Sequence, residues 1–342
     1  MNPIEYIYKL GFDLHKSAYK YSFLKEHKLN VPVICIGNLT MGGTGKTPIV
    51  EYTANYLHEL GKHPAILSRG YKGNTQSSQS HVVTDGNTII SSPDQCGDEP
   101  YLLAQNTNGI IIIVNKNRYL GGQLAIGKFG CDVIVMDDGF QHHALKKDCS
   151  IVVIDSTNPF GNGRLIPLGI LREPIDALSR ANAVILTHVP FAKNLSEIKD
   201  KIKSVNPNIP IIESVHMPDS FVDLNDKSII DLSDIMGKKT VSLSAIGNPK
   251  NFNNTLTDLG IDVVHSLEYR DHYFYNDNDV NEISQACEKY KPDYLITTQK
   301  DAIKFESLNI EKINCPFIYL KIKIEFLNNK DILNELIKKY AN

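Results

Sequence analysis

The stretch "VPVICIGNLTMGGTGKTPIVEY" (residues 31–52) decides the fold class of this chain. An apolar run precedes a glycine-rich turn and an amphipathic run follows it, which is the order of a strand, a phosphate-binding loop and a helix. The Walker A pattern requires Gly, four residues, then Gly-Lys-Ser/Thr. Gly45, Lys46 and Thr47 match its second half, but Thr40 stands where its first Gly belongs. The stretch therefore predicts a nucleotide site with a variant loop.

A phosphate-binding loop works through backbone N–H groups that point at the anion from a tight turn and a helix N-terminus. Glycines in the turn allow the main chain to approach the phosphates closely. Lys46 is expected to bind the β- and γ-phosphates, and the Thr47 hydroxyl to bind Mg²⁺. The nucleotide-binding residues that we predict are the whole turn, namely Thr40, Met41, Gly42, Gly43, Thr44, Gly45, Lys46 and Thr47.

The composition indicates a globular protein with two domains. The chain has 342 residues, more than one ordinary core needs. With 42% hydrophobic and 22% charged residues it can bury a core, and its net charge of −3 gives no indication of nucleic acid binding. Six cysteines without a C-x-x-C pair argue against a disulfide or zinc framework. No apolar run approaches the roughly 20 residues of a membrane-spanning helix.

The pattern of apolar runs predicts an α/β fold. From residue 31 to about residue 215, short β-rich runs alternate with helical ones, and several runs are apolar throughout, as in parallel strands covered on both faces. We therefore predict a P-loop NTPase-like, doubly wound, mainly parallel sheet over residues 31–215, with ligands beyond the carboxyl ends of its strands. Residues 216–238 indicate an extended two-stranded linker. Resumed alternation predicts a second, smaller α/β domain over residues 239–342.

The first 30 residues predict an amphipathic helix. Its apolar stripe consists of Ile7, Leu10, Leu14, Ala18 and Tyr21, and five lysines oppose three acids in residues 4–28. A helix that lies on an anionic bilayer has this pattern. A helix that packs on its own domain has it too, so the residues alone leave both interpretations open.

Acidic residues occur where a phosphotransferase would need them. Asp137 and Asp138 end the predicted strand "CDVIVMDD", where carboxylates organise Mg²⁺ in P-loop enzymes; the alternative is a pair of acids satisfied by a helix cap. Asp98 and Glu99 of "GDEP" precede Pro100, so they can serve catalysis or only cap a helix. The same choice stays open for Glu173 of "REPIDAL" and for Asp271 and His272 of "YRDHYFY".

Taken together, these motifs resemble one family, the tetraacyldisaccharide 4'-kinases, which act on a lipid A precursor in the biosynthesis of the Gram-negative envelope. The matching pieces stand in the family's order and are "GNLTMGGTGKTP", "LSRGYKG", "GDEP", "DDGFQH", "GNGRLIPLGILREP", "AIGNPKNF", "DHYFY" and "TTQKDAIKF". They span residues 31 to about 305, and "DDGFQH" downstream of this variant loop is specific. The family's loop is similar to "NLTxGGTGKT", which accounts for Thr40.

The resemblance implies ATP- and Mg²⁺-dependent phosphorylation of the 4'-hydroxyl of a tetraacylated glucosamine disaccharide 1-phosphate, which gives lipid IVA. By motif, the expected catalytic residues are Asp98, His272 and Lys46. Asp98 is expected to be the base that takes the hydroxyl proton, His272 to orient Asp98, and Lys46 to bind the triphosphate. The expected metal-side residues are Thr47, Asp137, Asp138 and Glu173. The expected substrate-side residues are Arg69, Tyr71, Glu99, Arg118, Gln141 and His142.

The resemblance also implies a location. The family is peripheral to the inner membrane, so residues 1–30 are expected to meet the bilayer on its cytoplasmic face. The implied partners are the lipid A disaccharide 1-phosphate and the membrane surface, with no nucleic acid and no protein partner.

Two other functions stay open on the residues alone. A P-loop GTPase or metallochaperone would read guanine through N-K-x-D, but in "VNKNR" Arg118 takes the position of that Asp. A non-catalytic nucleotide switch would tolerate Asp98→Ala. The kinase interpretation predicts that this substitution abolishes turnover while ATP binding is largely retained.

Overall fold

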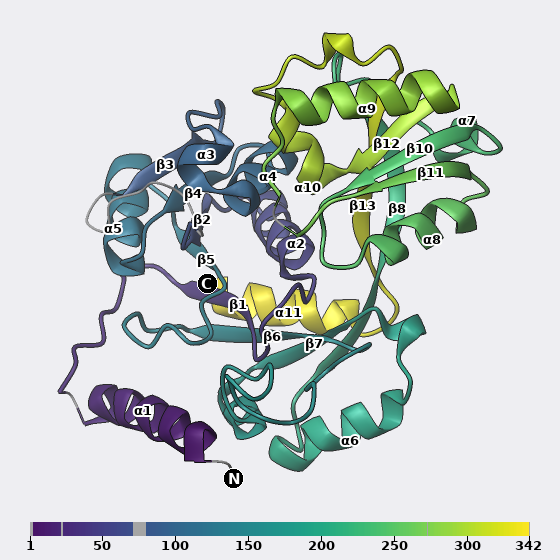
Figure 1. Ribbon diagram of the computed structural model, residues 1–342. Coiled ribbons are helices and arrows are strands. Elements are labelled where there is room, and N and C mark those ends of the chain that lie inside the picture. The colour runs from purple at the N-terminus through teal and green to yellow at the C-terminus, as the bar shows by residue number, and fades with distance from the viewer. Residues whose placement is uncertain (1–2, 22, 71–79, 272, 342) are drawn as a thin grey trace. The chain divides into compact units, whose positions relative to one another are not determined.

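Figure 1 shows the computed structural model of the chain, which describes residues 3–21, 23–70, 80–271 and 273–341. The chain divides into two compact units, Met1–His216 with Ile324–Asn342, and Met217–Lys323. Both boundaries lie inside strands, β8 (Ile211–Asp223) and β13 (Phe317–Phe326). The first boundary lies at the start of the predicted linker, residues 216–238, whereas the second boundary lies far downstream of that linker.

The first unit is a sheet with helices on both faces. Its further strands are β1 (Val33–Asn38), β2 (Pro64–Ser68), β3 (His81–Asp85), β4 (Ile111–Val114), β5 (Val133–Asp137), β6 (Cys149–Asp155) and β7 (Ala183–Thr187). Its helices are α1 (Pro3–Lys20), α2 (Lys46–Glu59), α3 (Pro93–Cys96), α4 (Asp98–Asn106), α5 (Arg118–Phe129), α6 (Leu195–Val205) and α11 (Lys330–Ala341), with 3₁₀ turns η1 (Ile175–Arg180) and η2 (Val189–Phe191).

The strand order confirms the predicted doubly wound sheet. The order is β8-β7-β6-β1-β5-β2-β4-β3, and the pairs from β8 to β4 are parallel, with only β3 antiparallel to its neighbour. The first strand in sequence, β1, therefore lies inside the sheet between β5 and β6, with Ile36 level with Asp137. The loops that leave the carboxyl ends of β1 and β5 are neighbours, which is where an open α/β sheet binds ligands.

β1 shows how the sequence builds both faces of this sheet. All of its residues are buried. Ile34 and Ile36 pack into the core that contains α2 and α11, whereas Val33 and Cys35 pack into the core that contains α5. Because both faces are covered, the strand needs no polar side, and this is the cause of the continuous apolar run in the sequence.

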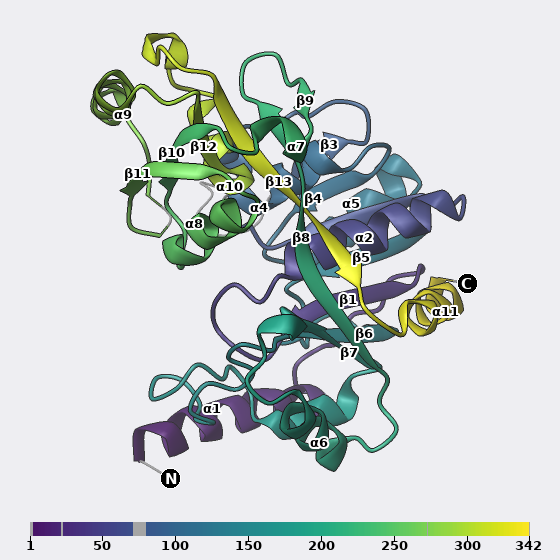
Figure 2. The ribbon, with the colours of Figure 1, turned by 90° about the vertical axis from the view of Figure 1, so that its right-hand side faces the viewer.

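The last helix, α11, corrects the predicted domain boundary. The sequence assigned residues 239–342 to the second domain, but α11 groups with the first unit. Leu333, Ile337 and Ala341 recur every four residues on one helical face and are buried in the core that also holds α2. Figure 2 shows α11 beside β1. An apolar stripe predicts that a helix packs, but not against which sheet.

α1 packs on the first unit and leaves apolar side chains in solvent. Glu5 is buried, and its Oε1 accepts a hydrogen bond from the Leu165 N–H at 3.0 Å. Leu10 and Leu14 of the predicted stripe are 47% and 62% exposed. Among the helices of the described residues, none is long and apolar enough to cross a membrane. The helix is therefore tied to its domain at one end while part of its stripe has no cover from the described chain.

The second unit is a smaller α/β assembly. Its strand order is β11-β10-β12-β13-β8, with parallel pairing from β11 to β13 and the short β9 antiparallel to β8. Its further strands are β9 (Ile229–Ile230), β10 (Lys239–Ser244), β11 (Asp262–Glu268) and β12 (Tyr294–Thr298). Its helices are α7 (Leu232–Ile235), α8 (Pro249–Asp258), α9 (Asp277–Tyr290) and α10 (Gln299–Ala302), with 3₁₀ turns η3 (Ile303–Phe305) and η4 (Ile310–Lys312).

Candidate active site

The phosphate loop, residues 39–47, joins β1 to α2. Gly42 and Gly45 have φ angles of 104° and 76°, which residues with a side chain rarely adopt. α2 begins at Lys46, so the loop leads directly into a helix N-terminus, where the first backbone N–H groups have no intrahelical acceptor. This is the backbone geometry that binds phosphate.

Neutral polar contacts hold the entry to the phosphate loop. Asn38 donates from Nδ2 to the Thr40 carbonyl oxygen at 2.8 Å and to Thr44 Oγ1 at 3.2 Å. Thr40 is buried and forms an antiparallel bridge with Leu171, and it is not among the residues with positive φ. The position of the missing Walker A glycine is therefore paired backbone that needs no glycine.

The carboxylate turn, residues 137–142, follows β5. Asp137 is buried and accepts a hydrogen bond from Ser68 Oγ at 3.0 Å. Burial, followed by the charge of Asp138, raises the pKa of Asp137 to about 6. A buried carboxylate with a raised pKa beside a second carboxylate indicates a place where a further cation is favourable.

Asp138 is the best neutralised acid of this turn. It has a φ of 48°, unusual for a residue other than Gly. Arg172 Nη1 donates to both of its oxygens, at 3.0 and 2.9 Å, and Lys46 Nζ lies 3.4 Å from Oδ1. Burial acts to raise the pKa of Asp138, but the charges of Lys46 and Arg172 outweigh it, and the net shift is downward. The lysine of the phosphate loop is thus joined to the carboxylate turn.

Two predicted substrate-side residues lie close to these acids. Arg118 is buried at the start of α5 and donates from Nη1 to the Asn115 carbonyl oxygen at 3.1 Å. Burial lowers its pKa to about 10, while the charges of Asp137 and Asp138 act in the opposite direction. Burial and the Arg118 charge lower the pKa of His142 to about 4, so this imidazole is neutral at pH 7.

Three buried polar atoms on and beside the carboxylate turn lack a hydrogen-bond partner in the described structure. Gln141 Nε2 donates to the Asn38 carbonyl oxygen at 2.9 Å and thereby connects the carboxylate turn to β1. Within the described part of the chain, Asn38 Oδ1, Gln141 Oε1 and His142 Nε2 have no hydrogen-bond partner. Buried polar atoms rarely stay unpaired, so these atoms are candidates to bind a polar ligand.

The "GDEP" segment reaches the same edge of the sheet. Asp98 and Glu99 form the first turn of α4, directly after Gly97, whose φ is 92°. The Glu99 charge contributes to the raised pKa of Asp137, which places the start of α4 close to the carboxylate turn. The first turn of α4 thus brings Asp98 and Glu99 toward the edge of the sheet that holds Asp137.

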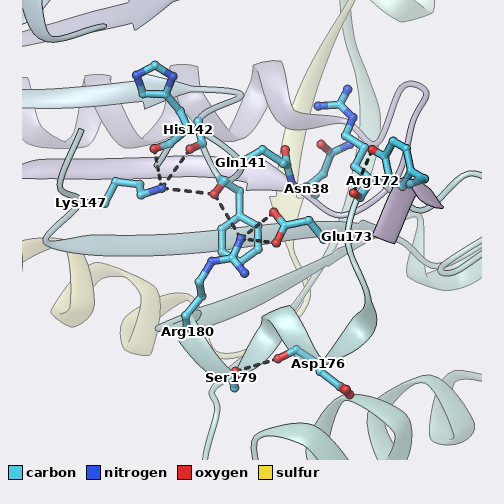
Figure 3. Close-up of polar contacts among 12 residues, drawn as sticks. Asn38, Gln141, His142, Lys147, Arg172, Glu173, Asp176, Ser179 and Arg180 are labelled. Atoms are coloured by element: carbon cyan, nitrogen blue, oxygen red, sulfur yellow. Dashed lines mark hydrogen bonds and ion pairs between the residues drawn. The ribbon is translucent and has the colours of Figure 1, made fainter. Parts of the chain in front are cut away.

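Glu173 has a partner other than the carboxylate turn. It is completely buried, and both of its oxygens accept from Arg180 Nη2 at 2.6 Å (Figure 3). The guanidinium carbon of Arg180 lies 3.9 Å from the centre of the Phe140 ring. The metal-side role predicted for Glu173 stays a prediction.

The structure brings most of the predicted residues to one edge of the first sheet. Tyr71 and His272 lie outside the described residues, and so their predicted roles are not addressed by the geometry. Sequence reasoning missed Asn38, Arg172 and Lys147. The sequence contained a signal for Arg172, because Arg172 directly precedes Glu173 in the motif "REP". The motif did not indicate whether Arg172 or Glu173 contacts the carboxylate turn.

The residues present fit a magnesium ion. In the described residues no group of three His, Cys, Asp or Glu side chains could hold a metal. Mg²⁺ does not need such a group, because it keeps several waters and binds through one or two carboxylates together with phosphate oxygens. Asp137 and Asp138 supply two such carboxylates, and burial together with the Asp138 charge raises the pKa of Asp137, as expected of a carboxylate that a cation would stabilise.

Comparison with known proteins gives a consistent result. The sequence matches the family described as tetraacyldisaccharide-1-P 4'-kinase over residues 1–342. The tetraacyldisaccharide 4'-kinase of Halothermothrix orenii is 37% identical over 99% of this chain and 92% of its own length, and that of Syntrophus aciditrophicus is 37% identical over 93% and 86%. A crystal structure of LpxK from Aquifex aeolicus in complex with ATP has a TM-score of 0.79 and 29% identity and covers 99% of this chain and 98% of that one.

These matches cover both units, and the phosphate loop, the "GDEP" segment and the carboxylate turn all fall within them. The alternatives of a GTPase, a metallochaperone or a non-catalytic switch are not favoured. The chain belongs to the tetraacyldisaccharide 4'-kinase family.

Proposed function

We propose that this kinase binds Mg²⁺–ATP at the phosphate loop and transfers the γ-phosphoryl group to the 4'-hydroxyl of a tetraacylated disaccharide 1-phosphate. The observation that carries the proposal is the contact of Lys46 with Asp138, because it joins the phosphate loop to the carboxylate turn. Phosphoryl transfer depends mainly on positioning and on neutralising charge, and these two loops supply both.

The proposed binding of the triphosphate uses backbone and side-chain donors. The N–H groups from Gly42 to Thr47 and the start of α2 bind the phosphate oxygens, and Lys46 spans the β- and γ-phosphates. Asp137, Asp138 and the Thr47 hydroxyl hold Mg²⁺. The ion, when bound, neutralises charge that develops on the phosphate oxygens. Glu173 is assigned to the metal side by the family motif, and it pairs with Arg180, which donates to the Phe140 carbonyl oxygen of the carboxylate turn.

The proposed acceptor side lies at the start of α4. Asp98, in the first turn of α4, takes the proton of the 4'-hydroxyl. His272 orients Asp98. Substrate contacts are assigned to Arg69, Tyr71, Glu99, Arg118, Gln141 and His142. The neutral His142 ring and the unpaired Gln141 oxygen suit sugar hydroxyls, which both donate and accept hydrogen bonds.

The activity is tested by incubating the protein with ATP, Mg²⁺ and the disaccharide 1-phosphate, with mass spectrometry of the lipid product. We expect a bisphosphorylated lipid from the wild type and from Asp94→Asn, an exposed acid in α3 that serves as the matched control. Asp98→Asn is expected to lower kcat about 10²–10⁴-fold, the usual contribution of a general base, with ATP affinity retained. A wild type that hydrolyses ATP without phosphorylating the lipid would contradict the proposal.

We also propose that α1 rests on the cytoplasmic face of the inner membrane and delivers the active site to its lipid substrate. The support is the exposed stripe, in which Leu10 and Leu14 project from a helix whose first turn is held by the domain. Co-sedimentation with phosphatidylglycerol vesicles tests this. Leu10→Asp with Leu14→Asp is expected to abolish binding, whereas Leu60→Asp, at an exposed leucine after α2, is not. Equal binding by all variants would disprove a role of α1.

A further inference from the structure

Lys147 occupies an unusual position behind the carboxylate turn. It precedes β6 and is half-buried, and its Nζ donates to three backbone carbonyl oxygens, those of Gly139 at 3.3 Å, Phe140 at 3.2 Å and His142 at 2.9 Å (Figure 3). An ammonium group has three N–H donors. Its whole donor capacity is therefore directed at one turn of the main chain.

The acceptors of Lys147 are the peptide groups that carry predicted functional side chains. The Phe140 carbonyl belongs to the peptide that leads into Gln141, and the Gly139 residue follows Asp138 directly. When these carbonyl oxygens are fixed, the backbone on both sides of Gln141 is fixed as well. The ammonium group thus determines the direction in which the side chains of the turn leave the main chain.

A second cation acts on the same turn from another element. Arg180 Nη2, at the end of η1, donates to the Phe140 carbonyl oxygen at 3.3 Å and its guanidinium covers the Phe140 ring. Arg180 is itself held by Glu173. The Phe140 peptide is therefore bound by both Lys147 and Arg180. Backbone carbonyls carry partial negative charge, and the two cations hold them in the part of the turn that follows the end of β5.

The carboxylate turn also contacts β1 directly before the phosphate loop. Gln141 Nε2 donates to the Asn38 carbonyl oxygen at 2.9 Å, and Asn38 donates to Thr40 and Thr44. Lys147 is thus connected to the phosphate loop through the backbone of the turn and the hydrogen bonds of Gln141 and Asn38. A displacement of the turn by 1 Å would move both the carboxylates and Gln141 relative to the nucleotide.

We propose that Lys147 is a positioning residue for phosphoryl transfer: it fixes the carboxylate turn so that Asp138 and Gln141 face the phosphate loop. The inference rests on the proposed function of these residues. Lys147 itself need not touch substrate, because its three protons are used by the main chain. Arginine keeps the charge but presents a planar fork in place of three converging donors, so it is expected to replace Lys147 only in part.

The test compares Lys147→Met, Lys147→Arg and Lys146→Met in the full-length protein. Lys146 is exposed and adjacent, so it is the matched control. We expect Lys147→Met to lower kcat about 10²-fold, the effect of a misplacement near 1 Å, with KM for ATP within about 3-fold of wild type. Lys147→Arg is expected to recover part of the loss, and Lys146→Met to behave as wild type.

A double-mutant cycle with Gln141→Ala separates positioning from a merely structural role. If Lys147 acts through the turn, the single substitution Gln141→Ala lowers kcat relative to the wild type. The double variant then has nearly the same kcat as Lys147→Met alone. If the two substitutions lower kcat independently, so that the factors multiply in the double variant, the proposal is overturned. It is also overturned if the loss of activity in Lys147→Met equals the loss of folded protein measured by circular dichroism. Failure of the wild type to form product would count against the proposed function instead, so the two failures are distinguishable.

Discussion

The phosphate loop and the carboxylate turn follow neighbouring parallel strands, β1 and β5, but they are held in opposite ways. The phosphate loop relies on its own backbone, with positive φ at Gly42 and Gly45, and its side-chain support is the neutral Asn38. The carboxylate turn has a positive φ at Asp138, which is not a glycine, and it is surrounded by cations.

This difference follows from the charge that each loop must carry. A loop that binds an anion needs its N–H groups directed at the ligand, so acidic side chains inside it would compete with the anion for those groups. A turn that holds a buried carboxylate next to a partly exposed one must be neutralised, because burial and a neighbouring like charge both disfavour the charged form. Lys46 and Arg172 supply this neutralisation from two different segments, while Lys147 binds the carbonyl oxygens of the same turn. The predictions below test whether the two loops are independent or act as one.

Lys46→Ala should give the largest effect, because Lys46 belongs to both loops. It loses the expected contact with the β- and γ-phosphates and also the Asp138 contact at 3.4 Å. We expect kcat to fall about 10³-fold, the loss typical of removing a charged donor from a transition state. Lys62→Ala, after the end of α2, is the control. A loss below 10-fold would show that the phosphate loop does not need its lysine.

Gly37→Ala should give the next largest effect, which is a loss of stability. A Cβ at Gly37 would lie 2.6 Å from Phe140 Cβ and 2.9 Å from the Phe140 backbone nitrogen, so β1 and the carboxylate turn would have to separate. Overpacking of this kind costs about 1–3 kcal/mol, measured as the free energy of unfolding in urea. Gly127→Ala in α5, where a Cβ meets nothing within 4 Å, is expected to be neutral or stabilising. Equal stability of both variants would mean that the two loops move apart freely.

Much of this arrangement was predictable because its signals are local. The strand, the glycine turn and the helix lie within residues 31–52, and the apolar run before Asp137 indicates a buried strand with acids at its end. Parallel strands bring their carboxyl ends to one edge, so the meeting of these two segments followed from the fold class. The resemblance to a family added the roles of Asp98 and His142.

The supports of the carboxylate turn were not predictable, because they come from distant positions in the chain. Arg172 binds Asp138 across 34 residues, and Gln141 binds Asn38 across 103. Lysines are common on surfaces, and no pattern distinguishes Lys147, which binds three carbonyl groups, from its exposed neighbour Lys146. Local motifs reveal the groups that contact a ligand, whereas the groups that hold them depend on tertiary structure.

Arg172→Lys and Arg172→Ala test how the carboxylate turn is held at its front. Arg172 contacts both oxygens of Asp138 through the single nitrogen Nη1. Lysine keeps the positive charge, but it lacks the planar guanidinium group and is shorter, so it replaces this contact only in part. Because both groups are partly exposed, the expected loss is moderate: kcat about 10-fold lower in Arg172→Ala, with Arg172→Lys between it and the wild type. Steady-state kinetics at saturating ATP would measure this. If Arg172→Lys equals the wild type, charge alone holds Asp138.

Asp137→Asn should give the smallest change in stability, and it should raise stability while it lowers activity. Burial and the Asp138 charge raise the pKa of Asp137 from 3.8 to about 6. Between these values the folded protein keeps a proton that the unfolded chain releases, so stability falls as pH rises through this window and the full cost is present above pH 6. Asparagine removes the charge and keeps an acceptor for Ser68.

We therefore expect Asp137→Asn to melt a few degrees higher than the wild type at pH 7.5 without Mg²⁺, and the gain to disappear as the pH falls to about 4. Added Mg²⁺ and ATP should narrow the gain by stabilising only the wild type, while kcat of the variant falls. Asp258→Asn, at an exposed acid in α8, should show neither change. A variant less stable than the wild type at pH 7.5 would mean that Asp137 is already neutralised by its neighbours. The carboxylate turn would then be balanced without a metal ion, and the contrast with the phosphate loop would rest on Asp138 alone.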